Sequence, residues 1–168
     1  MSKQLLLLRH AKSSWSDESL GDRERGLNNR GRRNAPMMGR ALAAVLEPQV
    51  VYVSPALRAQ RTLGGLQDGW PGLQELEHIT EEALYTFSAQ ELVDWIRSRE
   101  NAPDSLFLIG HNPALTDLVN WVCGETVLPN LPTAGFAQLQ LNIERWPDLA
   151  PGCGRLQQRL FPKELPDA

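Results

Sequence analysis

The chain has 168 residues, the size of one ordinary domain, and a net charge of −3 from 17 basic and 20 acidic side chains. This balance excludes a broad basic surface, so we expect neither nucleic acid nor a membrane as a partner. Cys123 and Cys153 lack metal-ligand spacing, and we expect reduced thiols. The apolar run at residues 5–8 is too short for a signal sequence. We therefore predict a cytoplasmic protein in which residues 1–168 form a single domain.

Three short apolar runs, at residues 5–8, 50–53 and 106–109, predict strands buried on both faces of a parallel sheet. Apolar residues at three- and four-residue intervals predict helices within residues 38–45, 92–96 and 115–122. This alternation predicts an α/β fold, a three-layer sandwich with a mostly parallel central sheet and helices on both faces. Residues 137–141 alternate apolar residues with glutamine, which predicts a half-exposed strand near the edge, paired with residues 156–161.

Unusual polar residues follow each of the three buried runs. They are Arg9 and His10 after the first run, Ser54, Pro55 and Arg58 after the second, and Gly110, His111, Asn112 and Pro113 after the third. Open α/β sheets bind ligands at the carboxyl ends of their parallel strands. We therefore expect these three segments to meet at one active site.

The residues at this expected site favour an anion, most simply phosphate. Ser54 and Asn112 are good helix N-caps, and Pro55 and Pro113 would then occupy the first helical positions. Two helix N-termini would point their free N–H groups at the ligand. Arg58 adds a planar guanidinium that donates two parallel hydrogen bonds to an oxyanion, and Arg9 does the same.

His10 and His111 are the candidates for the chemical step. An imidazole is largely neutral at pH 7, so one ring nitrogen has a lone pair that can attack phosphorus. Three other interpretations are weaker. A purely structural role, with each histidine hydrogen-bonded to backbone groups in the core, does not explain why both stand beside arginines. A metal site conflicts with the positive charges of Arg9 and Arg58. A serine triad through Ser54 or Ser13 lacks its characteristic glycine-flanked turn.

These residues resemble the histidine phosphatase (phosphoglycerate-mutase-like) superfamily, and within it the short bacterial phosphohistidine phosphatases of the SixA type. The resemblance covers residues 5–161. It rests on the segments Leu8-Arg9-His10-Ala11-Lys12-Ser13-Ser14-Trp15, Leu27-Asn28-Asn29-Arg30-Gly31, Ser54-Pro55-Ala56-Leu57-Arg58-Ala59-Gln60-Arg61-Thr62, Gly110-His111-Asn112-Pro113 and Leu131-Pro132-Thr133-Ala134-Gly135.

The resemblance implies that His10 is the nucleophile and that Arg9, Arg58 and His111 complete the phosphate site. It also implies that Ser13 and Ser16 approach the phosphate, and Asn112 joins them as a candidate substrate-binding residue. No metal or other cofactor is implied. The chain lacks the long insertions that cover the site in larger members, so we expect an open site in one domain without a large lid.

Two positions depart from the superfamily pattern. Ala11 stands where glycine is common, which predicts that the backbone there needs no positive φ. Thr86 stands where a carboxylic acid is usual, so the proton donor is not identified. Asp22, Glu81 and Glu82 are the candidates for this role.

We therefore expect a metal-independent phosphatase that acts on protein phosphohistidine through a covalent intermediate on His10. Its partner would be a phosphohistidine-containing protein. Two alternatives remain open on the sequence: a general phosphomonoesterase for small phosphate esters, and a phosphohistidine-binding module without turnover.

Overall fold

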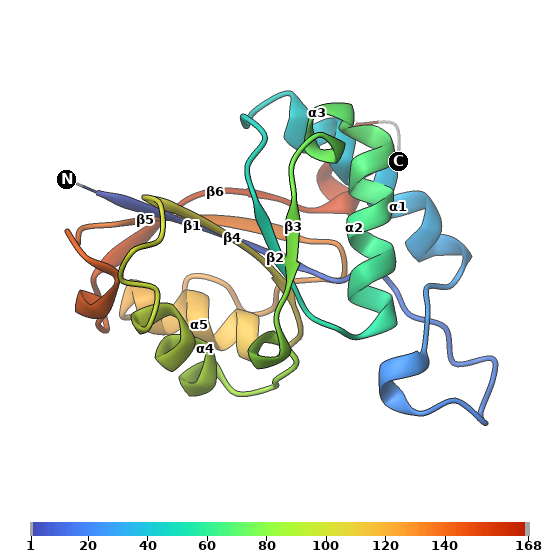
Figure 1. Ribbon diagram of the computed structural model, residues 1–168, viewed down its shortest axis with the longest axis horizontal. Coiled ribbons are helices and arrows are strands. Elements are labelled where there is room, and N and C mark those ends of the chain that lie inside the picture. The colour runs from blue at the N-terminus through green and yellow to red at the C-terminus, as the bar shows by residue number, and fades with distance from the viewer. Residues whose placement is uncertain (1, 167–168) are drawn as a thin grey trace.

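The computed structural model describes residues 2–166, which form a six-stranded sheet in the order β3-β2-β4-β1-β5-β6 (Figure 1). β1, β2, β3 and β4 are mutually parallel, whereas β5 is antiparallel to both β1 and β6. The predicted mostly parallel sheet is therefore confirmed. The strands are β1 Lys3–Arg9, β2 Val51–Val53, β3 His78–Thr80, β4 Ser105–Gly110, β5 Phe136–Leu141 and β6 Gly154–Leu160.

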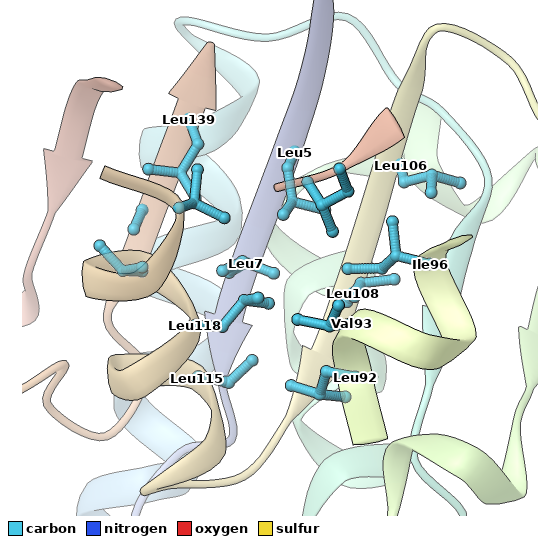
Figure 2. Close-up of a cluster of buried hydrophobic side chains, with 14 of the residues drawn as sticks. Leu5, Leu7, Leu92, Val93, Ile96, Leu106, Leu108, Leu115, Leu118 and Leu139 are labelled. Carbon is cyan, nitrogen blue, oxygen red and sulfur yellow. The ribbon is translucent and has the colours of Figure 1, made fainter. Parts of the chain in front are cut away.

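Helices cover both faces of this sheet, which confirms the three-layer arrangement. Leu6 and Leu8 of β1 pack in one apolar cluster with residues of α1 (Asn29–Ala43) and α2 (Leu57–Gly69). On the opposite face, Leu5 and Leu7 pack with α4 (Ala89–Arg97) and α5 (Ala114–Cys123), as Figure 2 shows. The short elements are α3 Pro71–Gln74, η1 Asp22–Glu24, η2 Glu82–Leu84, η3 Trp146–Asp148 and η4 Pro162–Glu164.

The side chains of β1 are buried on both faces of the sheet, which fixes the position of its carboxyl end. Leu5, Leu6, Leu7 and Leu8 are each at most 1% exposed, and burial of one such side chain stabilises the fold by roughly 1.5–3 kcal/mol. β1 also lies between β4 and β5, so it is paired along both edges. The residues that directly follow β1 are thereby held in place by the sheet.

The strand predicted within residues 137–141 exists as β5, but the prediction that one of its faces is exposed is wrong. Gln138 is buried, because its side-chain amide donates to Gln4 and accepts from Gln158 on the two neighbouring strands. The glutamine side chains thus hydrogen-bond to one another across the sheet, whereas the alternating pattern predicts that they face water. The edge strand is β6, which pairs with β5 as expected and alternates in exposure along its length.

Two further properties complete the fold. No helix within residues 2–166 is long and apolar enough to cross a membrane. Cys123 and Cys153 are both free thiols, and burial raises the pKa of Cys123.

Candidate active site

His10 directly follows β1 and is 7% exposed. Its Nδ1 lies 2.8 Å from the carbonyl oxygen of Ala11. A carbonyl only accepts hydrogen bonds, so in the neutral ring Nδ1 carries the proton and Nε2 keeps its lone pair. Burial, together with the nearby charges of Arg58 and Arg9, lowers the pKa of His10 to about 4. The imidazole is therefore neutral at pH 7, as a nucleophile requires.

The backbone around His10 is fixed by two long-range contacts. Its N–H donates to the carbonyl of Gly110 at the end of β4 (3.1 Å), and the next N–H, of Ala11, donates to the hydroxyl of Thr62 on α2 (2.8 Å). Ala11 is not among the positive-φ residues of the described chain, in agreement with the prediction from its departure from glycine.

His111 follows β4, and its ring centre lies 5.1 Å from that of His10. Its Nε2 lies 2.8 Å from the Ser54 hydroxyl oxygen, which already accepts the N–H of Ala56 (3.2 Å). The Ser54 hydroxyl has a proton that it can donate to Nε2, and on this basis we assign the ring proton of His111 to Nδ1. Burial, followed by the charges of His10 and Arg58, lowers the pKa of His111 to about 3. A neutral His111 with a free Nδ1–H is the result.

Arg9 and Arg58 approach this histidine pair from β1 and α2. Arg9 donates through Nη1 to the carbonyl of Leu131 (3.0 Å), and burial lowers the pKa of its guanidinium. Arg58 is 2% exposed and donates through Nη1 and Nη2 to the carbonyl and carboxylate of Asp22 (2.6 and 2.9 Å).

Three buried polar atoms at this site have no hydrogen-bond partner within residues 2–166: Arg9 Nε, Arg58 Nε and His111 Nδ1. With the protonation assigned above, all three are N–H donors. Buried donors are rarely left unpaired in folded proteins, because an unmade hydrogen bond costs about 1–3 kcal/mol. Three such donors beside a lone-pair nitrogen form a site that is complementary to an oxyanion.

Arg25 is a further member of the site, which the sequence patterns do not predict. It is 7% exposed, donates to the Ser13 hydroxyl (3.0 Å) and to the Asp22 carboxylate (2.8 Å), and stacks 3.5 Å above the Trp15 ring centre. Its charge also contributes to the lowered pKa of His10. The segment around Arg25 returns to the site because Leu27 forms a β-bridge with Ser13.

Gly31 allows the start of α1 to pass close to the loop that follows β1. A Cβ atom on Gly31 would lie 2.3 Å from the carbonyl oxygen of Lys12, which only glycine avoids. Gly31 also donates its N–H to the side chain of Asn28 (2.9 Å), the N-cap of α1. This close approach carries the polar end of α1 to the edge of the site.

Asp22 is a carboxylate in direct contact with one of the catalytic candidates, Arg58. It accepts hydrogen bonds from Arg25, Arg58 and the hydroxyl of Tyr85. Burial raises the pKa of Asp22, but these hydrogen bonds and the Arg58 charge outweigh it and hold the pKa far below its usual range. Asp22 is therefore ionised at neutral pH and carries no proton to donate.

The other candidate acids have partners of their own. Glu81 accepts from the indole N–H of Trp95 (2.9 Å) and lies 3.9 Å from Arg99. Glu82 forms a two-pronged, exposed pair with Arg23 (3.0 and 3.0 Å), and this hydrogen bonding lowers the pKa of Glu82.

Thr86 is buried and donates to the carboxylate of Glu91. Its neighbours in the chain face the histidine pair, since the Tyr85 and Phe87 rings are centred 5.4 and 5.7 Å from the His111 ring. The segment expected to hold the acid thus places aromatic rings, rather than an acid, beside His111.

The three predicted substrate-binding residues have different surroundings. Ser13 is 8% exposed and contacts Arg25, so it lies within the site. Ser16 is exposed and pairs with Ser14 (2.9 Å). The side-chain amide of Asn112 donates to the carbonyl of Leu131 (3.0 Å) and to the side chain of Asn130 (3.1 Å), and it accepts from the N–H and the hydroxyl of Thr116 (3.1 and 3.0 Å). Direct contact of these residues with substrate remains a prediction.

The predicted helix starts are wrong by one or two residues. α2 begins at Leu57 with Ala56 as its N-cap, and α5 begins at Ala114 with Pro113 as its N-cap. Ser54 does not cap a helix, because its hydroxyl serves Ala56 and His111 instead. Asn112 lies one position before the observed N-cap, and its side chain still accepts the N–H of Thr116 in the first turn of α5.

The family model of the histidine phosphatase superfamily (branch 1) matches residues 5–116, which is two thirds of the chain and includes all four catalytic candidates. The chain belongs to the histidine phosphatase superfamily. It is therefore a phosphatase, and the family prediction is confirmed.

Several known proteins resemble this histidine phosphatase along most of its length. An uncharacterized chloroplastic protein of Arabidopsis thaliana is 29% identical over 174 residues, covering 96% of this chain and 79% of that protein. A structure assigned as the phosphohistidine phosphatase SixA of Nakamurella superposes with a TM-score of 0.78 at 21% identity, covering 96% and 97% of the two chains. The protein histidine phosphatase SixA in complex with tungstate gives 0.76 at 23% identity, covering 95% and 97%. At these identities the two structures establish a shared fold.

Proposed function

We propose that this histidine phosphatase hydrolyses phosphohistidine on proteins, with His10 as the nucleophile. The observation that carries the proposal is the set of three unpartnered buried donors around a neutral imidazole. Such donors stabilise the charge that spreads over the phosphoryl oxygens in the transition state. The fold shared with SixA proteins further supports this choice of substrate.

The reaction proceeds in two displacements. The lone pair of His10 Nε2 attacks phosphorus while the bond from phosphorus to the substrate nitrogen breaks, and its electron pair goes to the leaving imidazole. The Nδ1 proton of His10 stays hydrogen-bonded to Ala11, which stabilises the phosphorylated ring as a cation. Water then attacks phosphorus and the bond to Nε2 breaks, with its electron pair returning to His10. The water oxygen and both of its protons leave with the phosphate as dihydrogen phosphate.

The choice of leaving group follows from the candidate acids. Asp22 is ionised, and Glu81 and Glu82 are engaged with Trp95 and Arg23 respectively. An alkoxide leaving group needs a proton donor, which typically contributes about 10²- to 10⁴-fold to the rate. An imidazole whose second nitrogen is protonated leaves as a neutral molecule and needs no such donor. Phosphohistidine therefore fits this site better than an alkyl phosphate ester.

The test is a comparison of kcat/KM on a phosphohistidine peptide, an aryl phosphate and an alkyl phosphate, with rapid-quench trapping of the enzyme. We expect the alkyl phosphate to be the poorest substrate by about 10²-fold or more. The trapped adduct should be labile in acid, stable in alkali and located on His10. Equal rates on all three substrates would favour a general phosphomonoesterase, and binding without phosphate release would favour a binding module.

A further inference from the structure

A groove of about 890 Å³ runs between α1 and α2, beside the active site. Gly26 and Leu57 line one end of the groove. They are the chain neighbours of the site residues Arg25 and Arg58. The two helices lie side by side in Figure 1, next to the loop that follows β1. One end of the groove therefore lies close to the site, where it can hold the part of a substrate that flanks the phosphoryl group.

The end of the groove nearest the site is basic. Arg32 of α1 and Arg61 of α2 line it, and both side chains are exposed. Arg32 is oriented by the carbonyl of Leu27 and the side chain of Asn29, which are neutral and leave its charge uncompensated. Neither arginine forms a salt bridge with any residue in 2–166.

The positive charge of α1 distinguishes the basic end of the groove from the rest of the chain, which is acidic overall. α1 carries four arginines, Arg30, Arg32, Arg33 and Arg40, and no acidic residue, although the whole chain has a net charge of −3. The acidic residue of the groove, Asp68, lies seven positions beyond Arg61 on α2, which is about 10 Å along a helix. The positive end thus faces the active site and the negative end points away from it.

We propose that this basic end binds an acidic segment of the phosphoprotein substrate, next to its phosphohistidine. This inference rests on the function proposed above. Exposed arginines attract carboxylates and steer an oppositely charged partner into register. Gly64 leaves room for the incoming backbone, because a Cβ atom there would meet nothing within 4 Å beyond its chain neighbours and the backbone of its own helix.

A polypeptide fits the groove better than a nucleic acid does. Its size is that of a site for a few residues rather than a duplex. Single-stranded nucleic acids are commonly held by stacking on aromatic side chains, and no aromatic residue of the described chain lines the groove. The charge of the groove and its position beside the site therefore indicate a peptide flank.

The experiment compares two synthetic phosphohistidine peptides, one with acidic and one with neutral flanking residues. The enzymes are the wild type, Arg61→Glu, Arg32→Glu and the control Arg40→Glu, which has the same charge change on α1 but lies outside the groove. We expect the wild type to prefer the acidic peptide by about threefold to tenfold in kcat/KM at low salt, and less at high salt. The groove variants should lose this preference, and Arg40→Glu should keep it.

Turnover of an aryl phosphate, which has no flank, should be the same in all four enzymes. Equal kcat/KM on both peptides in the wild type would overturn the groove proposal and leave the proposed function intact, as would a preference that survives both groove variants. If neither peptide is hydrolysed, the proposed function fails instead.

A binding assay tests the groove without any turnover. Anisotropy of the labelled, unphosphorylated acidic peptide should show binding to the wild type and to Arg40→Glu, and weaker binding to Arg61→Glu. Equal binding to all variants would overturn the groove proposal. Tighter binding of a single-stranded oligonucleotide at the same two arginines would identify a nucleic acid as the occupant and overturn it as well.

Discussion

The active site has two parts that are held in different ways. The site floor consists of Arg9, His10, Arg58 and His111, which stand at the ends of β1 and β4 and on the first turn of α2, and the two histidines are at most 7% exposed. The site rim consists of Trp15, Asp22 and Arg25, and Trp15 is 68% exposed. The floor is positioned by the sheet and by long-range backbone contacts, whereas the rim is largely held by hydrogen bonds and stacking within one loop.

This difference suggests a division of tasks. Chemistry needs atoms placed to within about 0.5 Å, which packed strands and helices provide. Recognition of a protein substrate tolerates and often needs a more mobile surface, which loops provide. Substitutions in the floor should therefore reduce the rate of the chemical step, and substitutions in the rim should act mainly on binding.

The largest effect is expected from His10→Ala. The ring supplies the nucleophile, so kcat should fall by at least about 10³-fold. The fold should persist, because the residues before and after His10 are held by backbone contacts that the substitution keeps. The measurement is single-turnover phosphate release, with circular dichroism and thermal unfolding as the control. Turnover that persists in a folded His10→Ala protein would exclude His10 as the nucleophile.

The floor could be predicted from the sequence, because its residues lie at most a few positions after short apolar runs that the sequence shows directly. Arg9, His10 and His111 need only the rule that parallel strands bring their carboxyl ends to one edge. Arg25 could not be predicted in this way. Its place depends on contacts with Ser13, Asp22 and Trp15, which a local pattern does not encode.

The errors in the strands and helices have the same origin. The exposure of β5 was mispredicted because Gln138 finds amide partners on β1 and β6, strands that are remote in sequence. The role of Ser54 was mispredicted because its hydroxyl reaches His111 across 57 positions. Local patterns predicted five of the six strands of the described chain and missed β3, whereas tertiary hydrogen bonds decided the use of individual polar side chains.

Substituting one arginine in each part tests the division directly. Arg58→Lys replaces a buried, forked donor with a point charge, and kcat/KM should fall by about 10²-fold. Arg25→Lys should cost about tenfold or less, mainly through KM, because the rim arginine is shared with Ser13 and Asp22. Steady-state kinetics on a phosphohistidine peptide separate the two outcomes. A larger loss in Arg25→Lys than in Arg58→Lys would show that the rim takes part in the chemical step.

The floor should also leave a signature in the pH dependence of stability. Folding lowers the pKa of His10 and His111 to about 4 and about 3, from an ordinary value of about 6.5. As pH falls below about 6.5, the unfolded chain binds protons that the folded chain does not. The free energy of unfolding should therefore fall with decreasing pH, by up to about 1.4 kcal/mol per pH unit for each histidine, and stay level above that pH.

Urea unfolding between about pH 7 and pH 5 measures this slope. The double variant His10→Asn and His111→Asn should have a shallower slope than the wild type, and His78→Asn, at an exposed position on β3, should keep the wild-type slope. An unchanged slope in the double variant would show that neither buried ring resists protonation in the folded state.

The smallest effect is expected from Asp22→Asn in the rim, and it decides whether Asp22 is the proton donor. The Asp22 carboxylate accepts from Arg58, Arg25 and Tyr85, which makes it a competing anion beside the phosphate site rather than an acid. Its amide keeps an acceptor oxygen but loses the charge, so kcat/KM on a phosphohistidine peptide should change by less than about tenfold. Inhibition by vanadate should become severalfold stronger, because the arginines are then freer to bind an oxyanion. Glu82→Gln is the matched control, since its pair with Arg23 is exposed and its loss should leave vanadate inhibition unchanged. If Asp22 were the general acid, the amide would instead lower the rate on an alkyl phosphate by about 10²- to 10⁴-fold, whereas vanadate, which needs no proton transfer, would inhibit as before.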